Sequence, residues 1–286
     1  MPRTLAIVGA GRVGRALGRS LRERAWRIGA VIDVSTARAR SAVRAIGAGL
    51  PRAAFSPELL DADVVLITTP DDIVRETAAR LAKFGGAAWR GKIVLHTSGS
   101  LSHTTLAPLA RCGAATAAMH PMQTFSIRGH PRLVGVVFGL DGEARALRVA
   151  RRIAKSLGGV PVEIRAAHKP AYHAAGGFAA PCVLTTVEAG IQILLRIGFS
   201  RRQATRALLN LARQTLDNLE RFGPRAAWSG PVSRGDFGTV AKHKAVLRAY
   251  SREQRAAYAA LARLSVQLFS PRPAPALRRL NRILSS

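Results

Sequence analysis

Three glycines near the start of the chain have the spacing of a phosphate-binding turn. They form the pattern G-x-G-x-x-G, which directly follows the apolar run 5–8 and opens an amphipathic helix. The first glycine permits a tight turn, the second allows close approach to a pyrophosphate, and the third lets helix and strand pack closely. The candidate cofactor-binding residues of this turn are Gly9, Ala10, Gly11, Arg12, Val13 and Gly14.

An acidic residue follows at the distance expected for recognition of a ribose. Asp33 lies 19 residues after Gly14, at the end of the second apolar run. A carboxylate there binds ribose hydroxyls and repels a 2′-phosphate, so it favours NAD over NADP. Arg38 and Arg40 follow and could neutralise a phosphate, so NADP stays an alternative. Thr69 and Pro70, after the apolar run 62–68, complete the candidate cofactor contacts.

The segments that position these residues alternate between apolar runs typical of β-strands and amphipathic patterns typical of helices. Apolar β-rich runs occupy residues 5–8, 28–34, 62–68 and 92–96, and helical patterns occupy about 12–26, 37–46 and 72–84. This alternation predicts an α/β fold with a doubly wound parallel sheet of the Rossmann type. Residues 134–164 continue it as a β-α-β extension. Beyond residue 165 only helical patterns remain, at about 169–196, 200–222 and 239–268 with a short terminal helix, so we predict domains at 1–166 and 167–286.

The charge of the chain is large but evenly spread. The net charge is +28, and residues 1–166 and 167–286 each carry +14 (25 − 11 and 19 − 5). Of the 44 basic residues 38 are arginine, which favours a compositional bias over a specific nucleic-acid surface. The two cysteines, Cys112 and Cys182, imply no disulfide framework, and the apolar run before Gly11 is too short for a signal peptide. We therefore expect a cytoplasmic protein.

One long helical segment, called below the charge-free segment, contains a single charged residue. Residues 170–195 contain no basic residue and one acid, Glu188. The length would allow a membrane span, but the polar and helix-breaking residues within it argue against one. We expect this helix to be buried in the domain core or against a second subunit, and hence a homodimer without membrane contact.

Several later motifs, in this order, resemble a known family. They are TPDD at 69–72, HTSG at 96–99, HPMQTF at 120–125, KPAYHAA at 169–175 and GPVSRGD at 230–236. Together with the glycine turn they resemble Rossmann-like proteins whose C-terminal part is called a domain of unknown function. That family is similar to the β-hydroxyacid dehydrogenase and pyrroline-5-carboxylate reductase group. The resemblance implies a nicotinamide cofactor, a helical C-terminal domain like that of 6-phosphogluconate dehydrogenase, and a dimer, but no particular substrate.

The resemblance also suggests catalytic residues. In β-hydroxyacid dehydrogenases a Lys and, four residues later, an Asn lie on the first helix after the Rossmann domain; Lys169 and His173 have this spacing. Lys169 would act as general acid, because a desolvated ammonium loses its proton more readily, and His173 would shuttle a proton or orient substrate. A solvated lysine and a structural histidine are the alternatives. Here His replaces Asn, and Pro181 stands where the closer family has Asn.

Further polar residues are expected at the edge of the sheet. The predicted loops after its strands carry a third candidate catalytic residue, His96, and the candidate substrate-binding residues Ser98, His120 and Gln123. In loop 229–238, Arg234 would clamp a substrate carboxylate and Asp236 would fix that arginine. The histidines and cysteines lack metal-ligand spacing, so we expect no metal.

These features favour an oxidoreductase. Hydride would pass between a nicotinamide cofactor and a small carbonyl, hydroxy-acid or imine substrate in an interdomain cleft. The alternatives are a non-catalytic dinucleotide-binding sensor or partner protein, which the replacements at His173 and Pro181 suggest, and a protein that associates with nucleic acid through its charge.

Overall fold

The structure is a computed structural model that describes residues 4–126 and 129–284. The chain divides into two compact units, Met1–Ala180 and Pro181–Ser286. The division falls 14 residues after the predicted boundary at 166/167. The reason is that the first helix after the sheet packs its Lys169 and Tyr172 side chains against strands and loops of the first unit.

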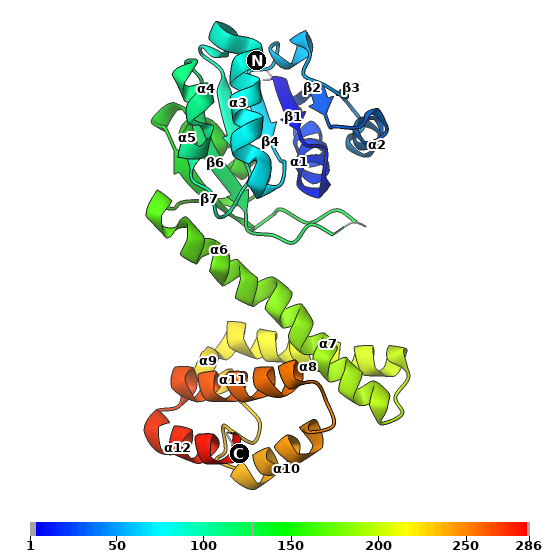
Figure 1. Ribbon diagram of the computed structural model, residues 1–286, viewed down its shortest axis with the longest axis vertical. Helices are drawn as coiled ribbons and strands as arrows, with labels where there is room; N and C mark the ends of the chain where they lie inside the picture. The colour runs from blue at the N-terminus through cyan, green and yellow to red at the C-terminus, as the bar shows by residue number, and fades with distance from the viewer. Residues whose placement is uncertain (1–3, 127–128, 285–286) are drawn as a thin grey trace. The chain divides into compact units, whose positions relative to one another are not determined.

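The first unit is built on one eight-stranded sheet (Figure 1). The strand order is β3-β2-β1-β4-β5-β6-β7-β8. The strands are β1 Thr4–Val8, β2 Arg27–Ile32, β3 Leu50–Arg52, β4 Val64–Ile67, β5 Ile93–His96, β6 Ala115–Pro121, β7 Val137–Gly142 and β8 Val160–Glu163. Strands β1 to β6 are parallel, as predicted for a doubly wound fold. The order reverses between β1 and β4, which is where such sheets bind ligands at their carboxyl ends.

Helices cover both faces of the sheet because its strands are apolar on both faces. The side of Leu5 and Ile7 is covered by α1 (Arg12–Arg22), α2 (Thr36–Ile46) and α5 (Ala144–Ser156). The side of Ala6 and Val8 is covered by α3 (Val74–Gly85) and α4 (Ala107–Arg111). Successive strand residues point to opposite faces, so one continuous apolar run supplies both cores.

The predicted β-α-β extension is present as β7-α5-β8, with β7 parallel to β8. It joins the sheet through β6, to which β7 is antiparallel. The sequence analysis did not predict β6, because Ala115, Ala117 and Ala118 lack the bulk and branching typical of strands. His120 therefore lies within a strand, opposite Gly139, and not in a loop as expected.

The second unit is helical, as predicted. Its helices are α7 Val183–Arg196, α8 Arg201–Phe222, α9 Pro224–Ala227, α10 Phe237–Leu247, α11 Arg252–Phe269 and α12 Pro273–Leu284. A small core contains Phe237, Val240, Val266 and Leu280. The helix predicted at 239–268 is interrupted, because Ser251 and Gln254 form a capping box that starts α11.

The charge-free segment is largely exposed in the single chain. It comprises α6 (Lys169–Gly177), a π-helical stretch (Phe178–Cys182) that contains Pro181, and α7. Ala166–Arg196 is long and apolar enough to cross a membrane by length and composition; its most apolar 18-residue window has a mean hydropathy of 1.6, and 6% of that window is buried. The expected burial in the core of its own domain is therefore not observed.

Candidate functional site

The glycine turn has the geometry that its sequence predicts. Gly9 has φ +97°, which an L side chain rarely adopts, and Cβ atoms added at Gly9 or Gly14 would overlap neighbouring atoms. At Gly14 the overlap is with the Gly9 carbonyl oxygen and Thr68 Oγ1, both 2.5 Å away. Gly11, by contrast, has nothing within 4 Å of the position of a Cβ. The turn is thus tight at its two ends and open at Gly11, which is also the N-cap of α1.

Asp33 is part of the same turn. Its Oδ2 accepts a hydrogen bond from the Ala10 N–H at 3.1 Å, and the residue is 8% exposed. Its Oδ1 is buried without a hydrogen-bond partner, although Arg38 Nε lies 3.3 Å away as an ion pair. The carboxylate therefore braces the glycine turn and is neutralised from outside by a mostly exposed guanidinium.

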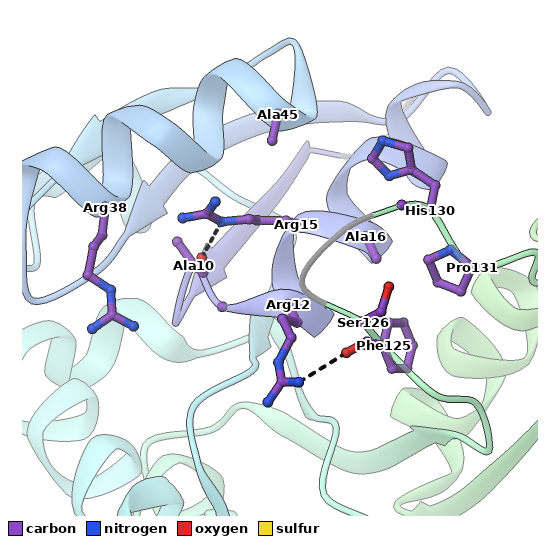
Figure 2. Close-up of a pocket in the computed structure, with 12 residues that line it drawn as sticks. Ala10, Arg12, Arg15, Ala16, Arg38, Ala45, Phe125, Ser126, His130 and Pro131 are labelled. Atoms are coloured by element: carbon purple, nitrogen blue, oxygen red, sulfur yellow. Dashed lines mark hydrogen bonds between the residues drawn. The ribbon is translucent and has the colours of Figure 1, made fainter. Parts of the chain in front are cut away.

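A cavity of about 400 Å³ lies beside Gly11 (Figure 2). Arg12, Arg15 and Arg38 line it, and the segment around Phe125 closes one side. Arg15 Nε donates to the Ala10 carbonyl at 2.8 Å, and an Arg12 guanidinium nitrogen donates to the Phe125 carbonyl at 3.4 Å (Figure 2). The cavity thus joins an exposed helix N-terminus to three cations, which suits a phosphorylated ligand.

The residues present fit a dinucleotide in two respects. Gly11 leaves the space that a pyrophosphate needs against the backbone. Two buried oxygens at the carboxyl edge of the sheet, Asp33 Oδ1 and Thr69 Oγ1, lack a hydrogen-bond partner among the described residues. Buried polar atoms are normally paired, so a bound polar group would complete both. Pro70 is exposed next to Thr69 and begins the turn Asp71–Ile73.

A network of internal hydrogen bonds holds the loop after β5. His96, the last residue of β5, is fully buried; its Nδ1 accepts the Ser98 N–H at 3.2 Å and its Nε2 donates to the Ser102 carbonyl at 3.1 Å. Ser98 Oγ donates to Asp71 Oδ2 at 2.7 Å. Burial lowers the pKa of His96 to about 4, so the ring is neutral at pH 7. Both ring nitrogens of His96 are engaged, and the residue organises the loop.

Lys169, at the start of α6, is fully buried under the same loop. Its Nζ donates to the Ser98 carbonyl at 3.4 Å, and no carboxylate of the described chain lies within ion-pair distance of it. Burial lowers its pKa, and the negative charges of Asp141 and Asp71 oppose that shift. Lys169 therefore places a poorly compensated cation directly behind the loop.

Three aromatic side chains meet at the carboxyl end of β6. Tyr172 Oη lies 3.0 Å from His120 Nδ1, and the rings of His120 and His173 meet edge to face with centroids 5.6 Å apart. Gly99 and Gly139 make room for them. A Cβ at Gly99 would lie 2.4 Å from His173 Nδ1, and one at Gly139 would lie 2.7 Å from the Tyr172 ring.

Electrostatics fix the protonation of this aromatic group. Burial lowers the pKa of His120 to about 4, and His173 and Lys169 contribute in the same direction. Burial raises the pKa of Tyr172 above its ordinary value. At pH 7 Tyr172 is protonated and the His120 ring is neutral. The Tyr172 hydroxyl lies 3.0 Å from His120 Nδ1 and 3.5 Å from the His120 carbonyl oxygen. When the hydroxyl donates to Nδ1, the ring proton of His120 lies on Nε2, the atom that faces Gly99.

The other predicted site residues have mainly structural contacts. Gln123 Nε2 donates to the Arg132 carbonyl at 3.2 Å and its Oε1 accepts the Thr124 N–H at 2.8 Å, which holds the loop after β6. Asp236 is the N-cap of α10 and binds the Thr239 N–H and hydroxyl, while Arg234 is exposed. Within the described ranges no group of three or more His, Cys, Asp or Glu side chains could hold a metal.

The sequence analysis missed two residues of the site. Tyr172 lies inside the quoted motif KPAYHAA, but its partners His120 and Gly139 are far away in the sequence. Asp71 lies in TPDD, and its role becomes visible only when the loop after β5 is placed beside it. Both could have been suspected from the sequence, because Tyr172 shares a motif with Lys169 and Asp71 shares one with Thr69.

Comparison with known proteins agrees with the architecture. Residues 2–121 match the family model of the Rossmann-like domain, and residues 136–265 match the domain of unknown function DUF2520. The chain thus consists of a Rossmann-like domain followed by a DUF2520 domain, which confirms the resemblance seen in the sequence. No curated protein sequence matches it.

Solved structures share this fold at low identity. A protein of Bacteroides fragilis described provisionally as an NADP oxidoreductase is 18% identical, with a TM-score of 0.72 over 92% of this chain and 98% of that one. A reductive aminase from Aspergillus terreus in complex with NADPH is 16% identical, with a TM-score of 0.66 over 94% and 95%. A pyrroline-5-carboxylate reductase from Coxiella burnetii is 14% identical, with a TM-score of 0.59 over 99% of each chain.

Proposed function

We propose that this protein is a nicotinamide-dependent oxidoreductase that acts on a small carbonyl, hydroxy-acid or imine substrate. The observation that carries the proposal is that the glycine turn and a pair of histidines lie at the same edge of one sheet. The open glycine turn follows β1, and the His120–His173 pair lies at the carboxyl end of β6, beyond the ends of β4 and β5. An elongated dinucleotide bound at the turn would extend along this edge toward the histidines.

The side chains divide the chemical work between them. When bound, the nicotinamide supplies or accepts the hydride. With its proton on Nε2, a neutral His120 can donate a hydrogen bond to the oxygen or nitrogen of the reacting double bond and stabilise the negative charge that develops there as the hydride arrives at carbon. The proton that the product keeps comes from solvent through His173, which is exposed. Lys169 and His96 act indirectly, because both are buried and engage the loop after β5.

We further propose that the preferred cofactor is NADP(H), although Asp33 alone favours NAD. Asp33 already binds the Ala10 N–H, and its remaining charge faces Arg38. Arg12, Arg15 and Arg38 line one cavity, so a 2′-phosphate would meet guanidinium groups there. The neighbours described with NADP or NADPH support the same preference.

Calorimetric titration with NADPH and NADH tests both statements. Wild-type protein freed of nucleic acid should bind NADPH with micromolar affinity, and Gly11→Asp should abolish binding without loss of stability, because Gly11 has room for a side chain and a negative φ. Arg38→Gln should weaken NADPH about tenfold and leave NADH unchanged. Arg40 was the other candidate for the phosphate, but it does not line the cavity, so Arg40→Gln on the same helix should affect neither. If neither cofactor binds, a dinucleotide-dependent function is excluded.

Turnover is a separate question from binding. A screen of small oxo acids and cyclic imines with NADPH should identify a substrate whose reduction His120→Phe abolishes while cofactor affinity is kept. If cofactor binds but no oxo acid, hydroxy acid or imine is turned over, the alternative of a non-catalytic dinucleotide-binding sensor is supported instead.

We also propose that two copies of the chain associate through the charge-free segment. Phe178, Val183 and Leu184 are 66%, 40% and 71% exposed along it. Two such segments can meet without the repulsion that a net charge of +28 imposes elsewhere, so a second copy is a suitable partner.

Light scattering at micromolar concentration tests this association. The wild type should have a dimeric mass, and Leu184→Glu should be monomeric. Val160→Glu, at an exposed position on the edge strand β8, should stay dimeric. A monomeric wild type, or one that floats with lipid vesicles through this segment, would contradict the proposal.

A further inference from the structure

A second cavity, of about 390 Å³, lies at the opposite edge of the sheet. It is formed where β4 and β5 begin and by one face of α5. Five cations and one carboxylate line it: Arg90, Lys92, Arg145, Arg148, Arg152 and Asp63. With four residues in β5 at about 3.3 Å each, it lies roughly 13 Å from the carboxyl edge of the sheet, so it is distinct from the glycine turn.

Two of the cations are held in place by backbone carbonyls. Lys92 Nζ donates to the Ala62 carbonyl at 3.1 Å, and the Arg145 guanidinium donates to the Gly91 carbonyl. Hydrogen bonds in the backbone also fix this loop, from Gly91 N–H to the Gly113 carbonyl at 3.1 Å and from Lys92 N–H to the Trp89 carbonyl at 3.0 Å. The floor of the cavity is therefore preorganised, which lowers the entropic cost of binding.

The other three cations have no partner in the described part of the chain. The guanidinium groups of Arg90, Arg148 and Arg152 make no hydrogen bond or ion pair there, and Asp63 already accepts the Thr4 N–H at 2.9 Å. Arg145, Arg148 and Arg152 are spaced three and four residues apart, so they share one face of α5. Like charges at this spacing destabilise a helix. An anion in the cavity would relieve that repulsion.

We propose that this cavity binds a small polyphosphate anion. Its net charge of +4 (five cations, one carboxylate) matches several phosphoryl groups, and guanidinium groups bind phosphoryl oxygens in bidentate fashion. The cavity is of a size typical for small-molecule ligands. This inference is independent of the proposed oxidoreductase function.

Calorimetric titration with inorganic triphosphate at about 150 mM NaCl tests the proposal, since surface charge is largely screened there. Wild-type protein freed of nucleic acid should bind one triphosphate. The triple variant Arg90→Gln, Arg148→Gln, Arg152→Gln should bind it at least about tenfold more weakly. Because that variant only removes like charges, its thermal stability should be equal or higher.

Two controls separate this cavity from general charge and from the cofactor site. Arg202→Gln, Arg206→Gln, Arg213→Gln removes the same charge from the exposed surface of α8 and should bind triphosphate as the wild type does. Gly11→Asp blocks the arginine-lined cavity at the glycine turn, which could itself hold a triphosphate, and should keep the one bound between β5 and α5. Equal weakening in the α8 variant, loss in Gly11→Asp, or no binding by the wild type would overturn the proposal. The proposal would also be overturned if a short single-stranded RNA, but not triphosphate, bound the wild type and was lost in the triple variant.

Discussion

The hydroxyl of Tyr172 lies 3.0 Å from Nδ1 of His120, and a hydrogen bond donated by this hydroxyl would hold the ring proton on Nε2. Tyr172→Phe removes the donor, and His120 should then populate both neutral tautomers. Nitrogen NMR of the ring should show the mixture, and the protein should lose about 1 kcal/mol of stability.

A second tyrosine–histidine pair provides a control for this prediction. Tyr258 Oη lies 2.8 Å from His243 Nδ1 in the helical unit. Tyr258→Phe should leave the NMR signals of His120 unchanged. If the His120 tautomer is the same in Tyr172→Phe as in the wild type, Tyr172 does not set it.

Gly11 and Gly14 should respond differently to alanine. Gly14→Ala places a Cβ 2.5 Å from two oxygens and should cost about 1–3 kcal/mol of stability, even though alanine is the better helix former. Gly11→Ala meets nothing within 4 Å and should change stability by less than about 0.5 kcal/mol, yet it should weaken dinucleotide binding. Urea denaturation and calorimetry separate the two effects, and equal losses of stability would contradict the assignment.

Burial of His96 should make stability depend on pH. Its pKa is about 4 in the folded protein and about 6.5 when unfolded, so the unfolded chain binds more protons between these values. Stability should therefore fall as pH drops from 6.5 to 4, by about 3 kcal/mol from this residue. His96→Gln should show a correspondingly smaller loss in urea denaturation, whereas the exposed His168→Gln should follow the wild type. An unchanged pH profile in His96→Gln would refute this cause.

Lys169 should cost stability at neutral pH. Its lowered pKa means that the folded state disfavours the charged form, so the penalty applies below the folded pKa and fades as pH rises toward the unfolded value. Lys169→Met should therefore be as stable as the wild type or more so at pH 7, with a smaller gain at pH 10. Lys83→Met, an exposed control on α3, should show neither effect. A large loss of stability in Lys169→Met would show that the ammonium is compensated after all.

The sequence predicted best what depends on neighbours in the chain. The turn from Gly9 to Gly14, the alternation of strands and helices, and the β7-α5-β8 extension all follow from local pattern. Strand β6 was not predicted because alanine has a low propensity for strands. Its conformation is determined by pairing with the neighbouring strands. The break before α11 could have been predicted, since Ser251 and Gln254 are a visible capping box.

The site was harder to predict because its contacts are distant in the sequence. His120 meets Tyr172 across 52 residues, and Ser98 meets Lys169 across 71. Residue type predicted Lys169 and His96 as catalytic residues, and only the structure shows that both side chains are buried at the loop after β5. Asp236 shows the same limit, since an Asp before a helix is as often an N-cap as a partner for arginine.

Closure of the loop after β5 over His96 and Lys169 gives the histidines of this site different chemical accessibility. An acylating reagent added to the intact protein can reach His173, whose ring is exposed, while His96 lies out of contact with solvent. Within this site the reagent should label His173 and spare His96, and peptide mapping distinguishes His173 from the exposed histidines elsewhere in the chain. Protection of that ring by a bound ligand would locate the ligand beside Gly99 even before a substrate is known.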